Sequence, residues 1–564
     1  MGERWRIGEA RFTDPLVELV ATSPEEVVAV IDRAEAHADE GKWVVGYVGY
    51  DASPGLVDHL VVPTSDDESV PLAWFGVYET ASELDSSPPG DSVVGTWEPT
   101  MTRSEHALRI ARIKEAIRAG ETYQVNLTMA LRSAFDGEPR ALFQGMVRSQ
   151  PKSYGSLVDL GGEQIVSISP ELFFSIEDRI VTMRPMKGTA PRGRSSADDD
   201  ERRMSLESSE KERAGNVMIV DMLRNDLGRV AETGSVNVPK LFEAERHPTV
   251  WQLTSTVESR LEKDVSLSDL FKATFPSGSV TGAPKVATMK IFSDIEPVQR
   301  GVYCGAIGYI EPGAGRSEFA VAIRTGIVSG DSLSYHVGGG ITVDSDADYE
   351  YDECLWKALV VTSTEEKPDL LETMRYEPGV GIRLLEGHLR RLTSSAAYWE
   401  IPLDLTSIGE ALSALEGHRP LKVRLILHRD GEIEVEQHEL ESSVDPVPLR
   451  IASKRIDPSD PLWYHKTANR DRYPELDDSG EETVLVNLDG EVTETNISNL
   501  MVLSGGRWTT PILASGCLPG VVRAQMLESG EVAESRLTVD DLRAADDLAV
   551  TNAVRGFRKA KLIE

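Results

Sequence analysis

A polar, proline-containing stretch at Ser363–Asp369 divides this chain of 564 residues into two parts. It follows a segment with a helical pattern and is typical of a linker. The chain is too long for one hydrophobic core, since single cores stop growing beyond about 250–300 residues. We therefore predict a first domain over residues 1–362, with 1–100 as a subdomain, a linker at 363–369, and a second domain over 370–564. A further boundary is predicted near Val444–Pro448.

The net charge of −34 excludes some functions. Such an acidic surface disfavours non-specific binding to nucleic acid or to anionic membranes. The chain has no run of about 18 apolar residues that would span a membrane, and residues 1–6 do not begin a signal peptide. The cysteines have neither metal-ligand nor disulfide spacing, which favours the cytoplasm; they are Cys304, Cys354 and Cys517.

Local patterns predict several elements. A helix is expected over Ser104–Ala119, with Ser104 as its N-cap and Gly120 as its stop. An exposed acidic loop is expected at Ser195–Asp200, followed by one long helix near Glu201–Arg229. Apolar runs predict strands at Trp43–Tyr50, Gly305–Glu311, Glu318–Ile327 and Ser334–Val337.

The stretch Arg184–Thr189 places Lys187 in a turn flanked by proline and glycine. A lysine held against a closed pocket loses proton affinity and becomes a nucleophile. One such motif alone is more often a surface lysine in a turn. Six further motifs accompany it: Glu121–Leu127, Ser169–Glu171, Met218–Gly228, Phe275–Lys285, Tyr303–Tyr309 and Gly338–Ile341.

In this order and spacing the motifs resemble the chorismate-utilising enzymes, and Arg184–Thr189 resembles the signature of aminodeoxychorismate synthase component I. The resemblance implies an α+β multidomain protein that begins with an α/β sandwich like that of anthranilate synthase component I. Anthranilate-forming relatives carry alanine at the position of Lys187. Relatives that add water to chorismate carry a lysine base at the position of Gln124, so hydrolytic isochorismate formation is disfavoured.

The resemblance also implies a reaction, the formation of 4-amino-4-deoxychorismate. Lys187 attacks C2 of chorismate, the C4 hydroxyl leaves, and ammonia at C4 then displaces the lysine. Glu171 would supply and recover the proton as general acid and base. The chain contains no Gly-x-Cys-x-Gly glutaminase elbow. A separate glutamine amidotransferase partner is therefore implied, unless free ammonia suffices.

Chorismate is a dianion, so its carboxylates need donors. Backbone N–H groups of Gly338, Gly339 and Gly340 can bind one carboxylate, and Arg324 can clamp another. Tyr303 is a further donor. Other substrate contacts are expected from the family at Gly188, Thr189, Thr281 and Lys357.

Glu350 and Glu353 lie three residues apart, on one face of an expected helix. Spacing alone equally describes a solvated acidic helix end, but Glu353 matches the Mg²⁺ ligand of the family. Two more ligands are expected on the helix before the Met218 motif. Glu212 occupies the first position, whereas Gly215 stands where relatives carry the second carboxylate. Weaker Mg²⁺ binding, or a weakened first activity, would follow.

The second part carries its own motifs: Leu371–Arg375, His388–Leu392, His465–Thr467, Asn487–Asn499 and Leu518–Arg523. They resemble fold type IV pyridoxal-phosphate (PLP) enzymes, the family of branched-chain aminotransferases and aminodeoxychorismate lyase. The resemblance assigns Lys466 as the lysine that bonds PLP, Glu494 as the partner of the pyridinium nitrogen, and Thr373 as a proton donor. The PLP phosphate would be bound by Arg391 and by the backbone at Val521 and Val522. The resemblance is compatible with a homodimer formed through this domain.

Two adjacent domains of these kinds favour a bifunctional enzyme. The first would aminate chorismate, and the second would eliminate pyruvate to give 4-aminobenzoate, the folate precursor. Two alternatives stay open. The second domain is an amino-acid aminotransferase, or the first is a non-catalytic chorismate- or partner-binding module that has decayed at Gly215.

Overall fold

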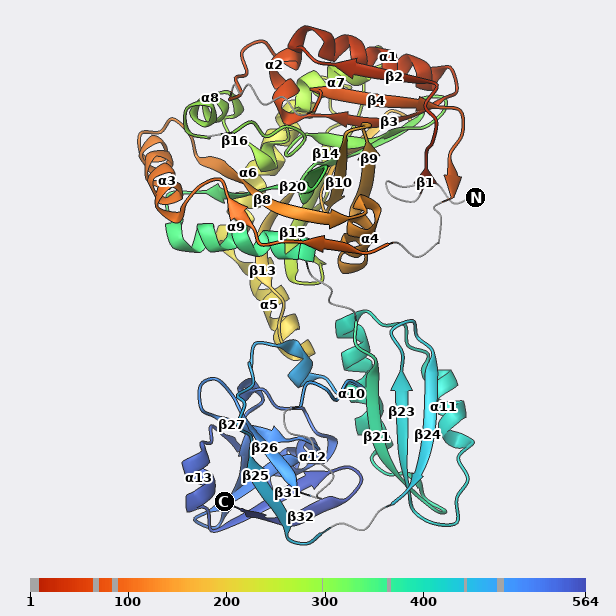
Figure 1. The fold of residues 1–564 in the computed structure, drawn as a ribbon, viewed down its shortest axis with the longest axis vertical. Coiled ribbons are helices and arrows are strands. Elements are labelled where there is room, and N and C mark those ends of the chain that lie inside the picture. Colours follow the sequence, from red (N-terminus) through yellow and green to blue (C-terminus); the bar gives the residue numbers. More distant parts are fainter. Residues whose placement is uncertain are drawn as a thin grey trace. The chain divides into compact units, whose positions relative to one another are not determined.

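The computed structural model describes residues 10–63, 70–83, 90–296, 298–362, 367–440, 444–473 and 481–563. The chain forms two compact units (Figure 1). The first contains residues 1–191 and 203–365, and the second contains Arg192–Arg202 together with Glu366–Glu564. A short segment from inside the first half of the sequence thus belongs to the second unit. Part of the predicted linker, residues 363–366, lies outside the described residues.

The first unit contains a ten-stranded antiparallel sheet whose order brings distant parts of the sequence together. Residues before position 80 supply three strands at one edge, and the strand that bears Lys187 lies at the other. The order is β13 (Met186–Pro191), β15 (Val250–Arg260), β12 (Ile180–Arg184), β11 (Leu172–Glu177), β18 (Arg316–Val321), β17 (Ala306–Ile310), β3 (Trp43–Val48), β4 (Ala73–Tyr78) and β2 (Val17–Ala21), with β14 (Asn237–Arg246) paired to β15.

A second antiparallel sheet of eight strands is built around the long strand β8 (Gln124–Gly137). Its order is β16 (Gly282–Ala283), β8, β20 (Ser332–Ile341), β19 (Thr325–Ser329), β10 (Glu163–Ser169) and β9 (Tyr154–Asp159); β6 (Ser92–Val94) and β7 (Glu98–Pro99) also pair with β8. The register of β20 with β19 ends at Tyr335, whereas its register with β8 continues to Ile341. Residues 336–341 therefore have one sheet edge that β19 does not cover.

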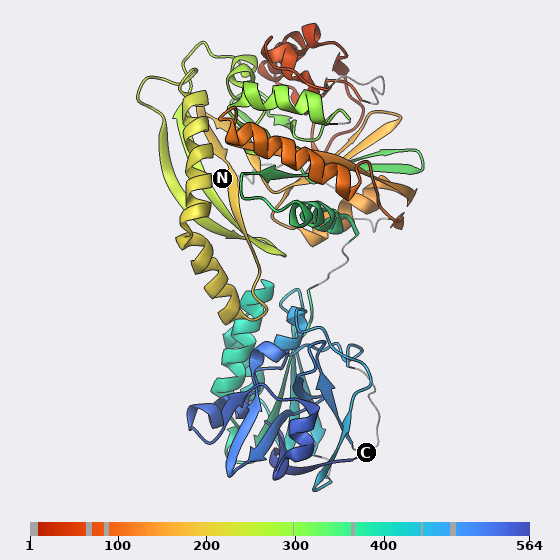
Figure 2. The same cartoon turned by 90° about the vertical axis from the view of Figure 1, so that its left-hand side faces the viewer.

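One apolar core joins the two sheets, because buried side chains from both enter it. Val125 and Leu127 come from β8, whereas Phe174 and Phe319 come from the larger sheet. Phe174 and Phe319 have ring centroids 5.2 Å apart. The helices of this unit are α1 (Val27–Asp39), α2 (Ser53–Leu56), α3 (Arg103–Arg118), α4 (Pro139–Ser149), α6 (Glu210–Leu227), α7 (Leu267–Thr274), α8 (Lys285–Ile295) and α9 (Ala347–Thr362). Figure 2 shows α6, in yellow, lying along the strands β14 and β15.

The second unit has two sheets. The first, β22 (Gly381–Ile382), β21 (Leu370–Glu377), β23 (Leu421–Leu427) and β24 (Ile433–Glu439), packs with α10 (Leu385–Trp399) and α11 (Leu405–Ser413). The second sheet is mixed. Its order is β27 (Val492–Thr495), β26 (Glu482–Val486), β25 (Val447–Ile451), β32 (Gly556–Leu562), β31 (Asp547–Asn552), β28 (Asn499–Ser504), β29 (Arg507–Pro511) and β30 (Ala533–Ser535). The helices that accompany this second sheet are α12 (Val521–Glu528) and α13 (Val539–Ala544).

Four local predictions were wrong. The N-cap of α3 is Thr102 rather than Ser104, because Thr102 and Glu105 form a reciprocal capping box. The expected helix over Glu201–Arg229 is two helices, α5 (Ser196–Ser208) and α6, because Ser209 caps α6 by accepting a hydrogen bond from the Glu212 N–H.

The third error concerns Ser195–Asp200, predicted as an exposed acidic loop. Most of it lies in the first turn of α5, and Asp199 is only 2% exposed. The Asp199 carboxylate is buried because it pairs with Arg192. The expected strand Glu318–Ile327 is also divided, into β18 and β19, at Arg324, whose φ of 51° interrupts an extended strand.

Within the described ranges, every helix is too short or too polar to cross a membrane.

Candidate active sites

Lys187 lies on β13 beneath the end of β20. A Cβ atom placed on Gly340 would lie 2.9 Å from Lys187 Nζ and 2.9 Å from Gln124 Nε2. A larger residue at position 340 would push the ends of both side chains away, whereas glycine leaves them where they are. The Nε2 of Gln124 is buried and has no hydrogen-bond partner among the described residues. A buried donor of this kind beside a lysine can donate a hydrogen bond to a polar ligand.

The backbone of Lys187 is held by helix α6. Asn216 Nδ2 donates to the carbonyl oxygen of Lys187 at 3.2 Å, and Ser255 Oγ donates to Asn216 Oδ1 at 2.6 Å. Gly188 next to it has a φ of 104°, in the region that favours glycine. Thr189, predicted as a substrate contact, is exposed and donates to Gln252 Oε1 at 3.0 Å. The sequence did not single out Asn216, although it belongs to α6 just before the Met218 motif.

Burial and the surrounding charges shift the pKa of Lys187. Removal from water and the nearby Lys357 ammonium lower the pKa of Lys187, and the carboxylates of Glu212, Glu350 and Glu353 oppose this. A lower pKa leaves a larger fraction of the amine neutral and nucleophilic near pH 7.

Glu171 precedes β11 and is 3% exposed. Burial raises its pKa to about 7, although the Ser279 hydroxyl, the Met186 backbone and the Lys187 charge act in the opposite direction. Ser279 Oγ donates to Glu171 Oε1 at 2.5 Å. A carboxyl group that titrates near neutrality can both give and take a proton. Ser279 lies in the motif Phe275–Lys285, but the sequence did not predict its hydrogen bond to Glu171.

Several predicted substrate donors have groups suited to an anion. Arg324 is half-buried and donates to the neutral Gln150 Oε1 at 2.7 Å. Lys357 Nζ donates to the carbonyl oxygen of Gly338 at 2.7 Å. Tyr303 is buried, and burial raises the pKa of its phenol, so the phenol stays protonated and can donate. The hydroxyl of Thr281 instead donates to the Ser277 carbonyl at 2.6 Å, which fixes the turn that carries Ser279.

The three predicted metal ligands lie around the same lysine. A Cβ on Gly339 would lie 3.0 Å from Glu350 Oε2, and a Cβ on Gly188 would lie 3.2 Å from Glu212 Oε2. Glu353 pairs with Lys357 at 2.7 Å. Within the described part of the chain, no three His, Cys, Asp or Glu side chains converge closely enough to enclose a metal ion. The carboxylates therefore suit Mg²⁺ only as a site completed by water and substrate.

In the second unit, Lys466 is held close to strand β21. Leu371 N–H donates to the carbonyl oxygen of Lys466 at 2.9 Å. Burial lowers the pKa of Lys466 to about 8; Arg391 and Arg470 also lower it, whereas Glu372 and Glu494 raise it. An amine with this pKa is partly neutral at pH 7, as bonding to an aldehyde requires.

Glu494 on β27 is a buried carboxylate near Lys466. Its Oε2 accepts hydrogen bonds from Asn499 Nδ2 at 3.2 Å and from Leu518 N at 3.1 Å. Burial raises the pKa of Glu494 to about 7, and the Leu518 backbone and Lys466 oppose this. A buried carboxylate that accepts hydrogen bonds from a neutral amide side chain and a backbone N–H is suited to a pyridinium N–H.

Arg391 on α10 is fixed by two residues that sequence reasoning did not assign. Glu372 accepts from Arg391 Nε at 2.8 Å and from Arg391 Nη2 at 2.6 Å, and His388 Nδ1 lies 2.6 Å from Glu372 Oε2. Burial alone would raise the pKa of Glu372, but Arg391 and His388 lower it to about 2. The spacing of His388 and Arg391, three residues apart on one helix, was the available signal.

The remaining predicted PLP residues lie on two elements. Val521 and Val522 begin α12, whose N-cap is Gly520. A Cβ on Gly520 would lie 1.8 Å from Asn499 Oδ1, so the close approach requires glycine. Thr373 on β21 is half-buried and faces the opposite side of the sheet from Glu372, by the alternation of a strand. The half-buried lysine Lys466, the buried carboxylate of Glu494, Arg391 and the helix N-terminus at Val521 together fit PLP.

Comparison with known proteins identifies the class. Residues 9–363 match the family of chorismate binding enzymes, which covers more than half of the chain, and residues 369–563 match amino-transferase class IV. The chain belongs to the chorismate-binding enzymes and carries a class IV aminotransferase domain after that region. The predicted family membership is confirmed.

Two individual relatives match the chorismate-binding region of the chain. The chain is 38% identical over 261 residues to aminodeoxychorismate synthase component 1 of Salmonella typhimurium, covering 46% of this chain and 57% of that protein. It is 34% identical over 316 residues to the protein of the same name from Escherichia coli, covering 55% of this chain and 68% of that protein. The matches thus span between about half and two thirds of these relatives.

A solved structure supports the fold of the first unit. Anthranilate synthase component I of Streptococcus pneumoniae superposes with a TM-score of 0.54 at 27% identity, covering 64% of this chain and 94% of that one. The predicted fold class, an α/β sandwich of this type followed by a fold type IV domain, is confirmed.

Proposed function

We propose that the chain makes 4-aminobenzoate from chorismate in two steps, one in each unit. The observation that carries the proposal is the pair of recessed lysines, Lys187 and Lys466, each with a lowered pKa and each in the motif of a different enzyme family. Curated relatives of the first unit are named aminodeoxychorismate synthase component 1.

In the first step, Lys187 Nζ attacks C2 of chorismate, and the C4–O bond breaks as Glu171 gives its proton to the departing hydroxyl. Water leaves. Ammonia then bonds to C4, the bond between C2 and Lys187 breaks, and Glu171 takes a proton from the new amine. The pKa of Glu171 near 7 supports both roles. The neutral amide of Gln124 beside Lys187 favours this route over addition of water.

Charged groups around the site support the substrate and its metal. Arg324 and Lys357 would bind carboxylates, and Tyr303 would donate a hydrogen bond. Glu212, Glu350 and Glu353 would hold Mg²⁺ with water and the substrate carboxylate completing its shell, and the ion would neutralise that carboxylate. Ammonia would come from a separate glutamine amidotransferase partner.

In the second step, PLP would be held by Lys466, Glu494, Arg391 and the N–H groups at Val521 and Val522, and it would supply an electron sink. Once the substrate amine has taken the place of Lys466 on PLP, the freed Lys466 Nζ would take the proton from C4 of the aminated intermediate. The bond between C3 and the ether oxygen breaks, and Thr373 passes a proton to the methylene of the leaving enolpyruvyl group. The products are 4-aminobenzoate and pyruvate. Three cysteines are free and buried in the described part of the chain: Cys304, Cys354 and Cys517. The cytoplasmic location expected from their spacing remains a prediction.

Amine transfer to a 2-oxo acid is the second candidate for the C-terminal unit, because its family match is to amino-transferases. The test is incubation of the full chain with chorismate, ammonia, Mg²⁺ and PLP, followed by identification of products. Appearance of 4-aminobenzoate and pyruvate supports the proposal. Accumulation of 4-amino-4-deoxychorismate, together with amine transfer to 2-oxoglutarate, would favour the aminotransferase. No ring amination at saturating Mg²⁺ and ammonia would favour a non-catalytic first unit.

A further inference from the structure

The segment Arg192–Arg202 belongs to the second unit although its sequence lies in the first half of the chain. It directly follows β13, which ends at Pro191 and bears Lys187. The class IV family match begins only at residue 369. The C-terminal unit therefore includes eleven residues that its own family pattern does not contain.

The segment is organised around one buried carboxylate. Asp199 Oδ1 accepts from Arg192 Nε at 2.7 Å and from Gly193 N at 2.9 Å. The side chains of Arg192 and Asp199 are only 8% and 3% exposed. A Cβ on Gly193 would lie 2.1 Å from the Asp199 backbone nitrogen, so glycine is required.

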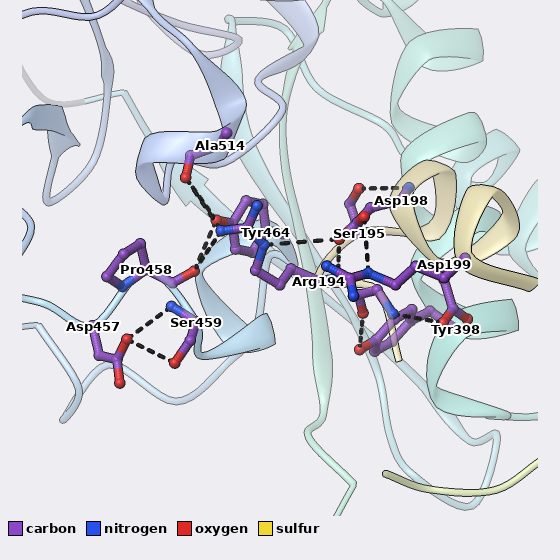
Figure 3. Close-up of polar contacts among 12 residues, drawn as sticks. Arg194, Ser195, Asp198, Asp199, Tyr398, Asp457, Pro458, Ser459, Tyr464 and Ala514 are labelled. Atoms are coloured by element: carbon purple, nitrogen blue, oxygen red, sulfur yellow. Dashed lines mark hydrogen bonds and ion pairs between the residues drawn. The ribbon is translucent and has the colours of Figure 1, made fainter. Parts of the chain in front are cut away.

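The turn binds the side chain and the backbone of Tyr398, near the end of α10. The Arg192 guanidinium lies 4.5 Å from the centroid of the Tyr398 ring and donates from Nη2 to the Tyr398 carbonyl at 3.2 Å. In return, the Tyr398 hydroxyl donates to the Gly193 carbonyl at 2.7 Å. Figure 3 shows Tyr398 beside the turn, with Arg194 extending toward Tyr464 and Pro458. Tyr398 is 6% exposed, so both partners are removed from water.

A second arginine ties the turn to the loop before Lys466. Arg194 Nη1 lies 3.4 Å from the carbonyl oxygens of Pro458 and Ala514, and its guanidinium lies 5.4 Å from the Tyr464 ring. The Tyr464 hydroxyl donates to the Pro458 carbonyl at 2.9 Å (Figure 3). Tyr464 is two residues before Lys466, so the turn braces the loop that carries the lysine.

His465 connects the turn to Lys466. Its ring lies 4.4 Å from the Tyr398 ring, and its Nδ1 lies 2.9 Å from Ser395 Oγ. It is 4% exposed, and burial lowers its pKa to about 4, so it packs as a neutral ring. Any displacement of Tyr398 would be transmitted to His465 and, through one peptide bond, to Lys466.

We propose that the segment Arg192–Arg202 is a positioning element of the PLP site: by clamping Tyr398 against His465, it fixes Lys466 toward the cofactor. The segment touches neither substrate nor PLP in this role. The proposal rests on the assignment of Lys466 as the PLP lysine. It makes the second activity dependent on a piece of sequence from within the chorismate-binding half.

The test uses full-length protein and three substitutions. Arg192→Ala removes the clamp. Arg192→Lys keeps a cation near Asp199 but loses the planar stack. Tyr398→Phe keeps the ring and removes the hydroxyl that donates to the Gly193 carbonyl. The control is Arg543→Ala, which breaks an exposed arginine–aspartate pair with Asp540 in the same unit. For each protein we would measure the PLP dissociation constant, the pH midpoint of the absorbance change of bound PLP, and chorismate amination.

Arg192→Ala should weaken PLP binding about tenfold and move the absorbance midpoint upward by about one pH unit, since water then reaches Lys466. Arg192→Lys and Tyr398→Phe should show smaller changes in the same direction, and Arg543→Ala should match the parent. Chorismate amination should be retained throughout and would report correct folding of the first unit. If Arg192→Ala does not fold, the two milder substitutions decide.

Unchanged PLP affinity and an unchanged midpoint in folded Arg192 and Tyr398 variants would overturn the proposal. That result differs from failure of the proposed function. If borohydride does not attach PLP to Lys466 in the parent protein, the PLP assignment fails and this inference fails with it. If the parent is labelled and the variants behave identically, the positioning role alone is wrong.

Discussion

Gly215 faces Lys187: a Cβ atom placed on Gly215 would lie 3.6 Å from Lys187 Cγ and 3.7 Å from Lys187 Cε. These are ordinary contact distances, so a side chain fits. The carboxylate that relatives carry at this position would therefore lie against Lys187. Its absence removes one anion from around Lys187, which helps to keep the amine neutral.

Gly215→Glu should have two effects. It should lower the Mg²⁺ concentration for half-maximal amination about tenfold, because it adds an anionic oxygen near Glu212. It should also raise the pKa of Lys187, since a new anion favours the ammonium, and move the acid limb of the rate profile to higher pH. Mg²⁺ titrations and pH–rate profiles check both effects, with Gly215→Ala as the control for helix propensity, worth about 1 kcal/mol. Identical Mg²⁺ titrations for the two variants would mean that position 215 does not serve the metal.

Lys187→Ala should reduce formation of 4-amino-4-deoxychorismate by about 10⁴-fold or more, the scale of loss when a nucleophile is removed. Conversion of supplied 4-amino-4-deoxychorismate to 4-aminobenzoate should be unchanged. Some anthranilate is expected, because anthranilate-forming relatives carry alanine at this position. Product analysis by chromatography checks the result, with the exposed Lys211→Ala as the control. Amination by Lys187→Ala at the Lys211→Ala rate would contradict covalent catalysis.

The rate of amination should depend on pH with two limbs. Activity falls at low pH as Lys187 is protonated, and it falls as pH rises through about 7, because Glu171 loses the proton that it must donate. Ser279 lowers the pKa of Glu171 through its hydrogen bond. Ser279→Ala should therefore move the basic limb upward by about one pH unit. An unmoved basic limb would show that it does not report Glu171.

Sequence patterns predicted the elements that depend on local chemistry, and they failed where a distant partner decides. The strands around Gly46 and Tyr309 follow from continuous apolar runs. Asp199 was predicted to be exposed because aspartates in series prefer water. Its burial depends on Arg192 and on Tyr398, which lies far along the chain. Likewise, no local sequence pattern predicts the left-handed φ of Arg324, which separates β18 from β19.

The candidate sites show the same limit. The resemblance of the ordered motifs to two enzyme families assigned roles to Lys187, Glu171, Lys466 and Glu494, and these roles remain predictions. The sequence did not predict the residues that fix the candidate site residues: Asn216 bonds the backbone of Lys187, Ser279 bonds Glu171, and Glu372 with His388 fixes Arg391. Their roles depend on which strand lies beside which helix, and that is a property of the folded chain.

Lys466→Ala should separate the two activities. The protein should lose the visible absorbance of bound PLP and should not be labelled by PLP and borohydride, because Lys466 is the partly neutral amine beside the buried Glu494. Release of 4-aminobenzoate should fall to background while chorismate amination continues, so 4-amino-4-deoxychorismate should accumulate. The control is Lys559→Ala, which removes an exposed lysine paired with Asp547 in the same unit. Production of 4-aminobenzoate by Lys466→Ala at the control rate would mean that the C-terminal unit is not the lyase, and the two-step assignment would fail.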